Sequence, residues 1–393
     1  METRKVAVVA AGTSQKWGIF PGTYRDLVAE AGKAVFDSCP ALSGGDIEGF
    51  IASSVMPERN VFQSHVAPLA AETLGVRPTK LFQRVENMCG SGTVAIRNAY
   101  TAIACGLADV IMVVGAEKMH TPEWGETVLN MLVGVDREWE GAVGVTAPVQ
   151  FALTAQMHMR RFGTTVEQLA AVSAKNHRHA LGNPYAQFPK ACTIDEVRAS
   201  KPVAAPFTIF DCSSITDGAA AVVLVCEERA REFTDQPIYL LGTGQAASGF
   251  NYANVHADWS EWPTLRTAVG SAYRMAGVGP GDIDVAEVHD CFSISEVIVT
   301  EEMGWAEKGG GGAFAAEGRS TYGGDVVVNP RGGLLGCGHP LGATGVAQAT
   351  EVFRQLRGEA GPRQVDGAAI GLTHNLSGVA EHHVVIYGRE EAL

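Results

Sequence analysis

The first third of the chain alternates short, mostly apolar runs with longer amphipathic stretches. The short runs are rich in Val, Ile and Phe and lie at residues 6–10, 50–53, 81–85 and 110–114. Between them, apolar residues recur at helical spacing at 24–39, 62–74 and 92–105. Runs without strict alternation of apolar and polar residues are typical of strands buried on both faces. The pattern therefore predicts an α/β fold in which helices cover both sides of a sheet.

One unit of helix, loop and strand occurs twice, far apart in the chain. Residues 45–48, with the sequence GDIE, follow a helical stretch and precede an apolar pair at 50–51. The related GDID at 281–284 lies 236 residues later, after a helical stretch at 268–276 and before an apolar run at 285–288. The repeat predicts two halves built on one supersecondary plan. A chance likeness between two such units is the alternative.

The segment between the two halves has a different character. From 118 to 209 the alternation stops, and this segment carries a net charge of +1 against −14 for the remainder of the chain. We therefore divide the chain into a first half (1–117 with 210–250), an inserted loop domain (118–209) and a second half (251–393). A basic strip in the insertion would suit an anionic ligand carrying phosphates, although a solvated helix face explains the same charges. The candidates are Arg160, Arg161, Lys175 and Arg178.

Composition excludes several classes of protein. Hydrophobic residues make up 46% of the 393 residues and charged residues 19%, which excludes a chain kept disordered by low hydrophobicity. A net charge of −13 disfavours nucleic acid and anionic membranes as main partners, and no apolar run is long enough to span a bilayer. The eight cysteines form no CxxC pair, which favours reduced thiols in a cytoplasmic protein over a zinc ribbon or a disulfide framework.

Cys89 is the first candidate for chemistry. It lies in the sequence ENMCGSGT at 86–93, where a predicted strand passes through a glycine-rich turn into an apolar helix. Unpaired N–H groups at the start of a helix favour negative charge, so we expect this thiol to ionise below its usual pKa and to act as a nucleophile. The alternative is a small buried cysteine beside glycines that are needed for packing.

Three further polar turns follow predicted strands, at the position where α/β folds place ligands. A lone histidine is more often structural, but four such turns in one duplicated chain indicate a site. The candidates are His289 and Cys291 in the first of these turns, Cys337 and His339 in the second, and His374, Asn375 and Gly378 in the third.

These motifs together resemble the thiolase superfamily, most closely its sterol-carrier-protein type, over nearly the whole chain. Cys89-Gly90-Ser91 matches the loop of the acyl-accepting cysteine, Gly338-His339-Pro340 matches the Gly-His-Pro loop, and residues 213–221 match a further thiolase segment. The resemblance implies a five-layer αβαβα fold made of two duplicated halves with an inserted loop domain on the coenzyme A side.

The chain departs from common thiolases in two loops. The usual Asn-Glu-Ala-Phe is replaced by a loop that contains His289 and Cys291, and the usual Cys-x-Gly loop is replaced by residues 374–376. In the sterol-carrier-protein type the cysteine of the former loop is thought to exchange protons, so the resemblance assigns the acid/base role to Cys291, with Cys337 as a rival. It assigns catalytic roles also to Cys89, His289 and His339.

The implied activity is a CoA-dependent thiolase reaction. A 3-oxoacyl-CoA is cleaved, or acyl-CoAs are condensed, through an acyl-Cys89 intermediate, in the degradation of fatty or aromatic acids. Coenzyme A is a substrate, and no metal or other cofactor is expected. A ketosynthase-like or retro-aldolase enzyme and a degenerate acyl-CoA-binding scaffold subunit are the alternatives. The resemblance further implies a homodimer or dimer of dimers and a possible small partner protein with a zinc site and an OB fold.

Overall fold

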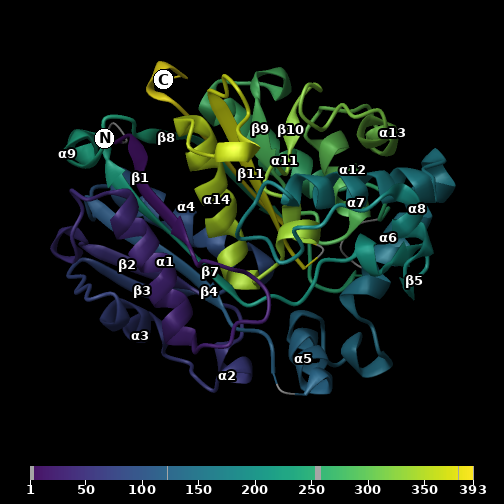
Figure 1. Ribbon diagram of the computed structural model, residues 1–393, viewed down its shortest axis with the longest axis horizontal. Coiled ribbons are helices and arrows are strands. Elements are labelled where there is room, and N and C mark those ends of the chain that lie inside the picture. The colour runs from purple at the N-terminus through teal and green to yellow at the C-terminus, as the bar shows by residue number, and fades with distance from the viewer. Residues whose placement is uncertain (1–3, 122, 253–257, 379, 393) are drawn as a thin grey trace.

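The computed structural model describes residues 4–121, 123–252, 258–378 and 380–392. Within these residues, ten strands form one continuous sheet (Figure 1). The first half of the sheet has the order β3-β2-β4-β7-β1 and the second half the order β10-β9-β11-β12-β8. The strands are β1 (Val6–Thr13), β2 (Gly49–Ser53), β3 (Leu81–Val85), β4 (Val110–Glu117), β7 (Gly218–Cys226), β8 (Ile238–Ala247), β9 (Val285–Glu287), β10 (Val327–Val328), β11 (Ile370–Ser377) and β12 (Glu381–Gly388).

The two halves share strand order and strand direction, which confirms the predicted duplication. In each half the first three neighbours are parallel and the last two pairs are antiparallel. A short antiparallel contact between β1 and β8 joins the halves through Ala7 with Tyr239 and Val8 with Ile238. Because β8 pairs with β12, this strand belongs to the second half. The predicted assignment of 210–250 to the first half therefore places that boundary one strand too late.

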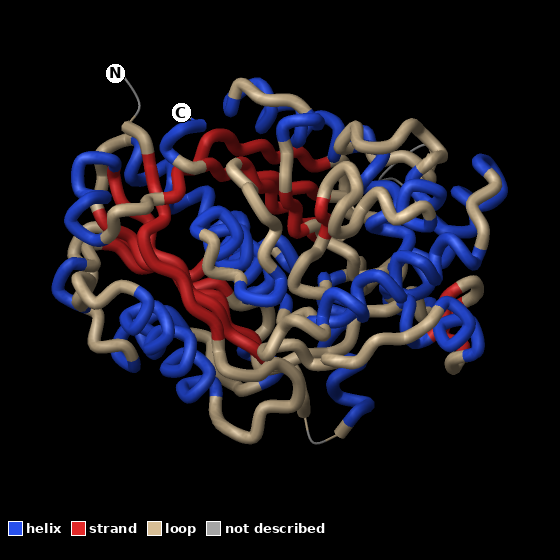
Figure 2. Tube along the Cα trace, turned by 45° about the horizontal axis from the view of Figure 1, so that its top comes forward, coloured by secondary structure: helices blue, strands red, loops and turns tan. Residues whose placement is uncertain are grey.

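Helices form three layers around the two halves of the sheet, which Figure 2 shows as red strands between blue helices. α1 (Tyr24–Ser38) and α3 (Val66–Thr73) pack on one side of the first half, and α11 (Pro263–Ala276) and α12 (Ser293–Glu302) pack on one side of the second half. α4 (Ser91–Ala104) and α14 (Leu341–Arg357) share the core between the halves. On β4, Ile111 and Val113 face this central core, whereas Met112 and Val114 face the outer one. The expected five layers are thus confirmed.

The central helices touch through their backbones. A Cβ atom at Gly345 of α14 would lie 2.4 Å from the backbone nitrogen of Thr93, and one at Gly92 of α4 would lie 2.8 Å from that of Val346. Both distances are shorter than any tolerable contact, so only glycine fits at these positions. At these two positions the backbones of α4 and α14 are therefore in direct contact.

The segment at 118–209 is mainly helical. It holds α5 (Trp124–Met131), α6 (Ala147–Phe162), α7 (Val166–Ala180) and α8 (Ile194–Ala199), followed by the small hairpin of β5 (Pro202–Ala204) and β6 (Phe207–Thr208). α7 begins at a capping box between Thr165 and Gln168. Within the described residues, the chain also forms the helices α2 (Pro57–Asn60), α9 (Glu227–Phe233) and α13 (Gly311–Ala316). Among the described residues, no helix is long and apolar enough to cross a bilayer.

Candidate active site

Cys89 lies in a tight turn, η2 (Met88–Gly90), between β3 and α4. The hydroxyl of Ser91 builds this turn, because it accepts a hydrogen bond from the backbone N–H of Asn87 (2.7 Å) and donates one to the carbonyl of Met88 (2.6 Å). The backbone N–H of Gly90 donates to Oγ of Ser377 (3.1 Å), which ties the turn to the second half of the molecule. Cys89 thus stands at the start of a central helix, as expected from the sequence.

His339 occupies the equivalent position in the second half, between β10 and the other central helix, α14. Its Nδ1 lies 2.7 Å from Oγ1 of Thr344, and that hydroxyl donates its own hydrogen to the carbonyl of Pro340. Oγ1 must therefore accept the hydrogen of Nδ1–H. The neutral ring then has no hydrogen on Nε2, which carries a free lone pair. Nε2 is buried and has no hydrogen-bond partner. The hydrogen bonds therefore prepare His339 to accept a proton.

His289, which follows β9, is held in the opposite way. The side-chain amide of Asn375 donates to its Nδ1 (3.4 Å), so the neutral ring carries its hydrogen on Nε2 and is a donor. The same amide donates to Oε1 of Gln348 (2.7 Å), which fixes its orientation. The backbone N–H of His289 donates to Nδ1 of His374 (3.4 Å), so His374 supports the loop rather than facing the cysteine. The two roles of a neutral imidazole, base and donor, are thus divided between His339 and His289.

Three of the predicted groups meet at one point. The sulfur of Cys89 and a ring nitrogen each of His289 and His339 all lie within 4.8 Å of one another. The two rings stand edge to face, with centroids 4.9 Å apart. Cys291 is also buried, and its thiol is close enough to that of Cys89 for the two to interact electrostatically. Its Sγ lies 3.8 Å from Oγ of Ser295. Cys89, His289 and His339 thus lie together, and Cys291 is buried close enough to interact with Cys89.

The charge state of Cys89 differs from the sequence-based expectation. Burial raises the pKa of its thiol from 9.0 to about 12, and the backbone N–H groups of Cys89 and Gly378 oppose this shift without overcoming it. Burial also lowers the pKa of His339 from 6.5 to about 3. The expected low pKa at the helix start is therefore wrong, because removal of water outweighs the helix end. A neutral thiol faces a neutral imidazole at pH 7.

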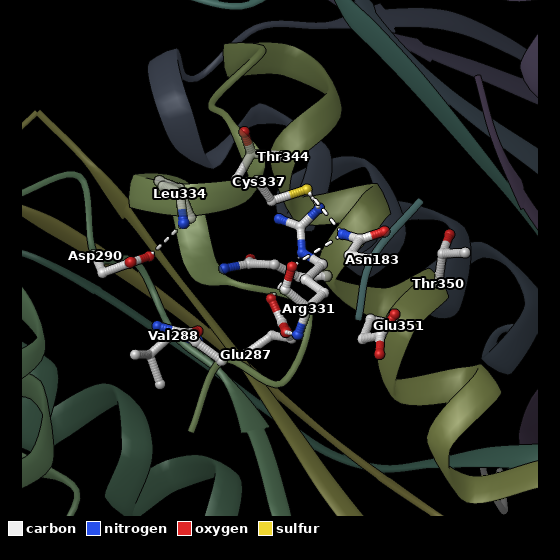
Figure 3. A network of polar contacts seen from close by, with 12 residues as sticks. Asn183, Glu287, Val288, Asp290, Arg331, Leu334, Cys337, Thr344, Thr350 and Glu351 are labelled. Atoms are coloured by element: carbon white, nitrogen blue, oxygen red, sulfur yellow. Dashed lines mark hydrogen bonds and ion pairs between the residues drawn. The ribbon is translucent and has the colours of Figure 1, made fainter. Parts of the chain in front are cut away.

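Cys337 lies in a different polar cluster (Figure 3). It accepts hydrogen bonds from the amide of Asn183 (3.2 Å) and from a guanidinium nitrogen of Arg331 (3.6 Å). Arg331 forms a buried ion pair with Glu287 (2.8 Å). Burial raises the pKa of Cys337 to about 11. Its contacts are those of a structural thiol in a buried network, not those of the group around Cys89.

Two carboxylates that sequence reasoning left without a role hold the site in shape. Asp290 accepts from the backbone N–H of Leu334 (2.6 Å) and so fixes the turn η7 (Gly333–Cys337) that leads to His339. Glu117, at the end of β4, accepts from the backbone N–H groups of Val55 (2.7 Å) and Gly342 (3.0 Å). Burial raises the pKa of each to about 7. The only sequence signal for such residues is an acid placed at the end of an apolar strand.

The predicted basic strip does not form one surface. Lys175 is 3% exposed, and its Nζ donates to Glu296 (2.5 Å) and to the carbonyl of Val328, so its predicted contact with a CoA phosphate is wrong. Arg161 is exposed but forms ion pairs with Asp258 and Glu261.

The two remaining arginines of the strip are exposed but separated. Arg160 lies at the end of α6, whereas Arg178 lines a cavity of about 430 Å³ with Tyr322 and Arg363.

Comparisons with known proteins cover almost the whole chain. Residues 7–228 match the family model "Thiolase, N-terminal domain", and residues 246–389 match "Thiolase C-terminal domain-like". An acetyl-CoA acetyltransferase of Methanothermobacter thermautotrophicus is 42% identical over 375 residues, which are 95% of this chain and 97% of that protein. Sterol carrier protein 2 of Oryctolagus cuniculus is 34% identical over 95% of this chain and 70% of its own length. The solved structure "Ltp2-ChsH2(DUF35) aldolase" has a TM-score of 0.84 at 23% identity and covers 98% of both chains, which shows a shared fold.

Proposed function

Because the chain belongs to the thiolase family, we propose that it is a CoA-dependent thiolase that works through an acyl group on Cys89. The observation that carries the proposal is the meeting of the Cys89 sulfur with ring nitrogens of His289 and His339 within 4.8 Å. In the degradative direction the substrates are a 3-oxoacyl-CoA and coenzyme A, and the products are two shorter acyl-CoAs. The reverse reaction is a Claisen condensation of two acyl-CoAs.

The first half-reaction forms the acyl-enzyme. The thiol proton of Cys89 moves to Nε2 of His339 as the sulfur attacks the 3-oxo carbonyl carbon. The bond between C2 and C3 then breaks, the acyl group stays on sulfur, and the electron pair stays on C2 as an enolate of acetyl-CoA. The Nε2–H of His289 would donate to the enolate oxygen, and the thiol of Cys291 gives its proton to C2.

The second half-reaction restores the enzyme. The thiolate of Cys291 takes the proton of the CoA thiol, and the CoA sulfur attacks the acyl carbon. Cys89 leaves as a thiolate and recovers its proton from His339, so every proton is returned. The backbone N–H groups of Cys89 and Gly378, which interact with the sulfur in the free enzyme, would stabilise the oxyanion of the tetrahedral intermediate. One such donor typically lowers the barrier by about 3 kcal/mol.

The resting state supports proton transfer during attack rather than before it. A thiol with a pKa of about 12 and an imidazole with a pKa of about 3 do not form an ion pair at pH 7. The thiolate therefore arises only while a carbonyl carbon is present to receive its electrons. This arrangement protects the free enzyme from oxidation, because the thiolate is the form of cysteine that oxidants attack.

The intact mass of the protein after incubation with acetyl-CoA tests the proposal. We expect an adduct of one acetyl group on Cys89, with loss of the adduct in Cys89→Ala. CoA-dependent cleavage of acetoacetyl-CoA by the wild-type chain should accompany it. Absence of the adduct would support the acyl-CoA-binding scaffold instead. A retro-aldol product without an acyl-enzyme would support the aldolase alternative, the activity for which the structural neighbour Ltp2-ChsH2(DUF35) aldolase is named.

A pair of cysteine variants tests the assignment of the proton carrier. Cys291→Ala should lose cleavage while retaining acetylation of Cys89, because the α-carbon then lacks its acid. Cys337→Ala removes a thiol of equal size from the separate buried network and should retain cleavage. Full activity of the Cys291 variant would overturn the assignment.

The CoA phosphates and the assembly are further parts of the proposal. We keep Arg160, Arg161 and Arg178 as candidate phosphate contacts, to be tested by the KM for CoA of their alanine variants. A homodimer or dimer of dimers is supported by β3, which lies at the edge of the sheet directly before Cys89 and exposes 45% of Phe82. Light scattering of Phe82→Glu tests it.

A small zinc-and-OB-fold partner protein is supported by the same aldolase neighbour, whose name joins two components, and co-purification with genetically adjacent small proteins tests it. All eight cysteines are free thiols, which supports a reducing compartment such as the cytoplasm. The degradation of fatty or aromatic acids as the pathway is tested by a panel of acyl-CoA substrates.

A further inference from the structure

The three groups that meet at the candidate site are also a donor set for a soft divalent cation. One thiol sulfur and two imidazole nitrogens lie within 4.8 Å of one another, so a movement on the order of 1 Å brings all three to the ~2.0–2.3 Å bond lengths of zinc. Sites with three protein ligands of this kind hold zinc with a fourth position open to water. Thiolate and imidazole favour Zn²⁺, Co²⁺ and related ions over Mg²⁺ and Ca²⁺.

A second observation points to a ligand at the same place. The side chain of His339 is only 6% exposed, and its Nε2 has no hydrogen-bond partner. Since Nδ1 is hydrogen-bonded to Thr344, Nε2 is the ring nitrogen that is available to bind a ligand. A buried lone pair without a partner is costly, and a bound cation would remove that cost.

We propose that Cys89, His289 and His339 form an inhibitory binding site for Zn²⁺ and similar thiophilic divalent cations. Binding replaces the thiol hydrogen of Cys89 by the metal and releases one proton to solvent, and each imidazole gives one lone pair, so no group is oxidised or reduced. The metal would occupy both the nucleophile and its base. That binding inhibits the reaction rests on the proposed function, whereas binding itself does not.

Metal binding at this site would also change the hydrogen bond between His289 and Asn375. Coordination through Nε2 moves the ring hydrogen to Nδ1, which now faces the donating amide of Asn375. Rotation of that amide would place its Oδ1, which is buried without a partner, opposite Nδ1–H, at the cost of the hydrogen bond from the amide to Gln348. In Asn375→Asp the carboxylate accepts this hydrogen directly, and such partners of a metal-bound histidine change affinity by about 10- to 100-fold. The aspartate variant should therefore bind zinc more tightly than the wild type.

Titration of the full-length protein with Co²⁺ tests the proposal. A thiolate-to-cobalt charge-transfer band in the near ultraviolet should appear, saturate at one ion per chain and disappear when Zn²⁺ is added. The band should be absent in Cys89→Ala and should need at least about tenfold more cobalt in His339→Gln. Cys105→Ser removes an exposed cysteine at the end of α4 and should leave the band unchanged. A thermal melt of each variant verifies that it is folded.

Each remaining outcome decides the proposal. A band that persists in Cys89→Ala, a band that Cys105→Ser abolishes, or the absence of binding to the folded wild type would overturn the metal site. If acetyl-CoA acetylates Cys89 but cobalt does not bind, the metal site alone fails. If cobalt gives the band and acetyl-CoA gives no adduct, the proposed function alone fails. If both hold, Zn²⁺ should inhibit cleavage at the concentrations at which it displaces cobalt.

Discussion

Replacement of Thr344 by valine removes the group that fixes the tautomer of His339 while keeping the size of the side chain. The hydroxyl lies 2.7 Å from Nδ1 and is its acceptor. Without it, the buried N–H loses its partner, and the hydrogen is free to move to Nε2, where it blocks the lone pair. In the transition state the ring becomes an imidazolium, and hydrogen bonds to charged groups are about twice as strong as neutral ones.

The magnitude follows from this difference between the two states. Loss of the acceptor costs about 1–3 kcal/mol for the neutral ring and about twice that for the imidazolium, so the part that grows in the transition state and slows the reaction is about 1–3 kcal/mol. We therefore expect Thr344→Val to lower the rate of Cys89 acetylation by about 5- to 150-fold. The rate is measured by rapid quenching with acetyl-CoA and intact-mass analysis, and kcat/KM for cleavage should fall by the same factor.

Thr350→Val is the matched control. Thr350 lies on the same helix, α14, is equally buried, and donates its hydroxyl to the carbonyl of Val346 inside the helix (2.9 Å). Figure 3 labels both threonines. The control should lose a similar amount of unfolding free energy and retain its acetylation rate. If the two variants acetylate at rates within twofold of each other, the hydroxyl of Thr344 does not orient the base and the reasoning is refuted.

Three further predictions concern buried charges. Arg363→Met leaves Glu351 buried without its charged partner and should lower the free energy of unfolding, measured in urea, by about 3–5 kcal/mol. A second substitution, Glu351→Met, should recover most of this loss, and a loss below about 1 kcal/mol in the single variant would contradict the prediction. Lys175→Met should cost about as much by leaving Glu296 unpaired, with an unchanged KM for CoA, whereas a raised KM at full stability would restore the phosphate role. His374 has a pKa of about 3 when folded and 6.5 as its ordinary value, so the unfolded chain binds the proton first and stability is lost as pH falls from 6.5 towards 3. Relative to His374→Asn, the wild type should therefore lose about 1.4 kcal/mol of unfolding free energy between about pH 7.5 and 5.5, and parallel pH profiles would refute this.

Local patterns predicted the elements well, because buried strands and central helices carry strong signals. The predicted run at 81–85 coincides with β3, and the predicted helix at 92–105 differs from α4 by one residue at each end. The two related loops at 45–48 and 281–284 precede β2 and β9, which hold equivalent places in the two halves. Each of these features depends on the nearby sequence alone.

The chemistry of the site depended on contacts that no local pattern contains. Lys175 was counted among free cations because its partner, Glu296, lies 121 residues away and only the fold brings the two together. The helix end beside Cys89 suggested a low pKa, but burial of the sulfur, which only the folded chain produces, raises the pKa instead. The hydroxyl of Thr344 was visible in the sequence, yet only its distance from His339 gives it a role.

The backbone contact between α4 and α14 sets the spacing between nucleophile and base. Cys89 precedes one helix and His339 precedes the other, and at Gly92 and Gly345 nothing but main chain separates the two. Substitutions elsewhere in the core change the volume of side chains, but no side chain sets the distance between the two helices at this backbone contact. A single methyl group at Gly345 would force the two helix backbones apart. It would thereby increase the distance between Cys89 and His339, although it contacts neither of them.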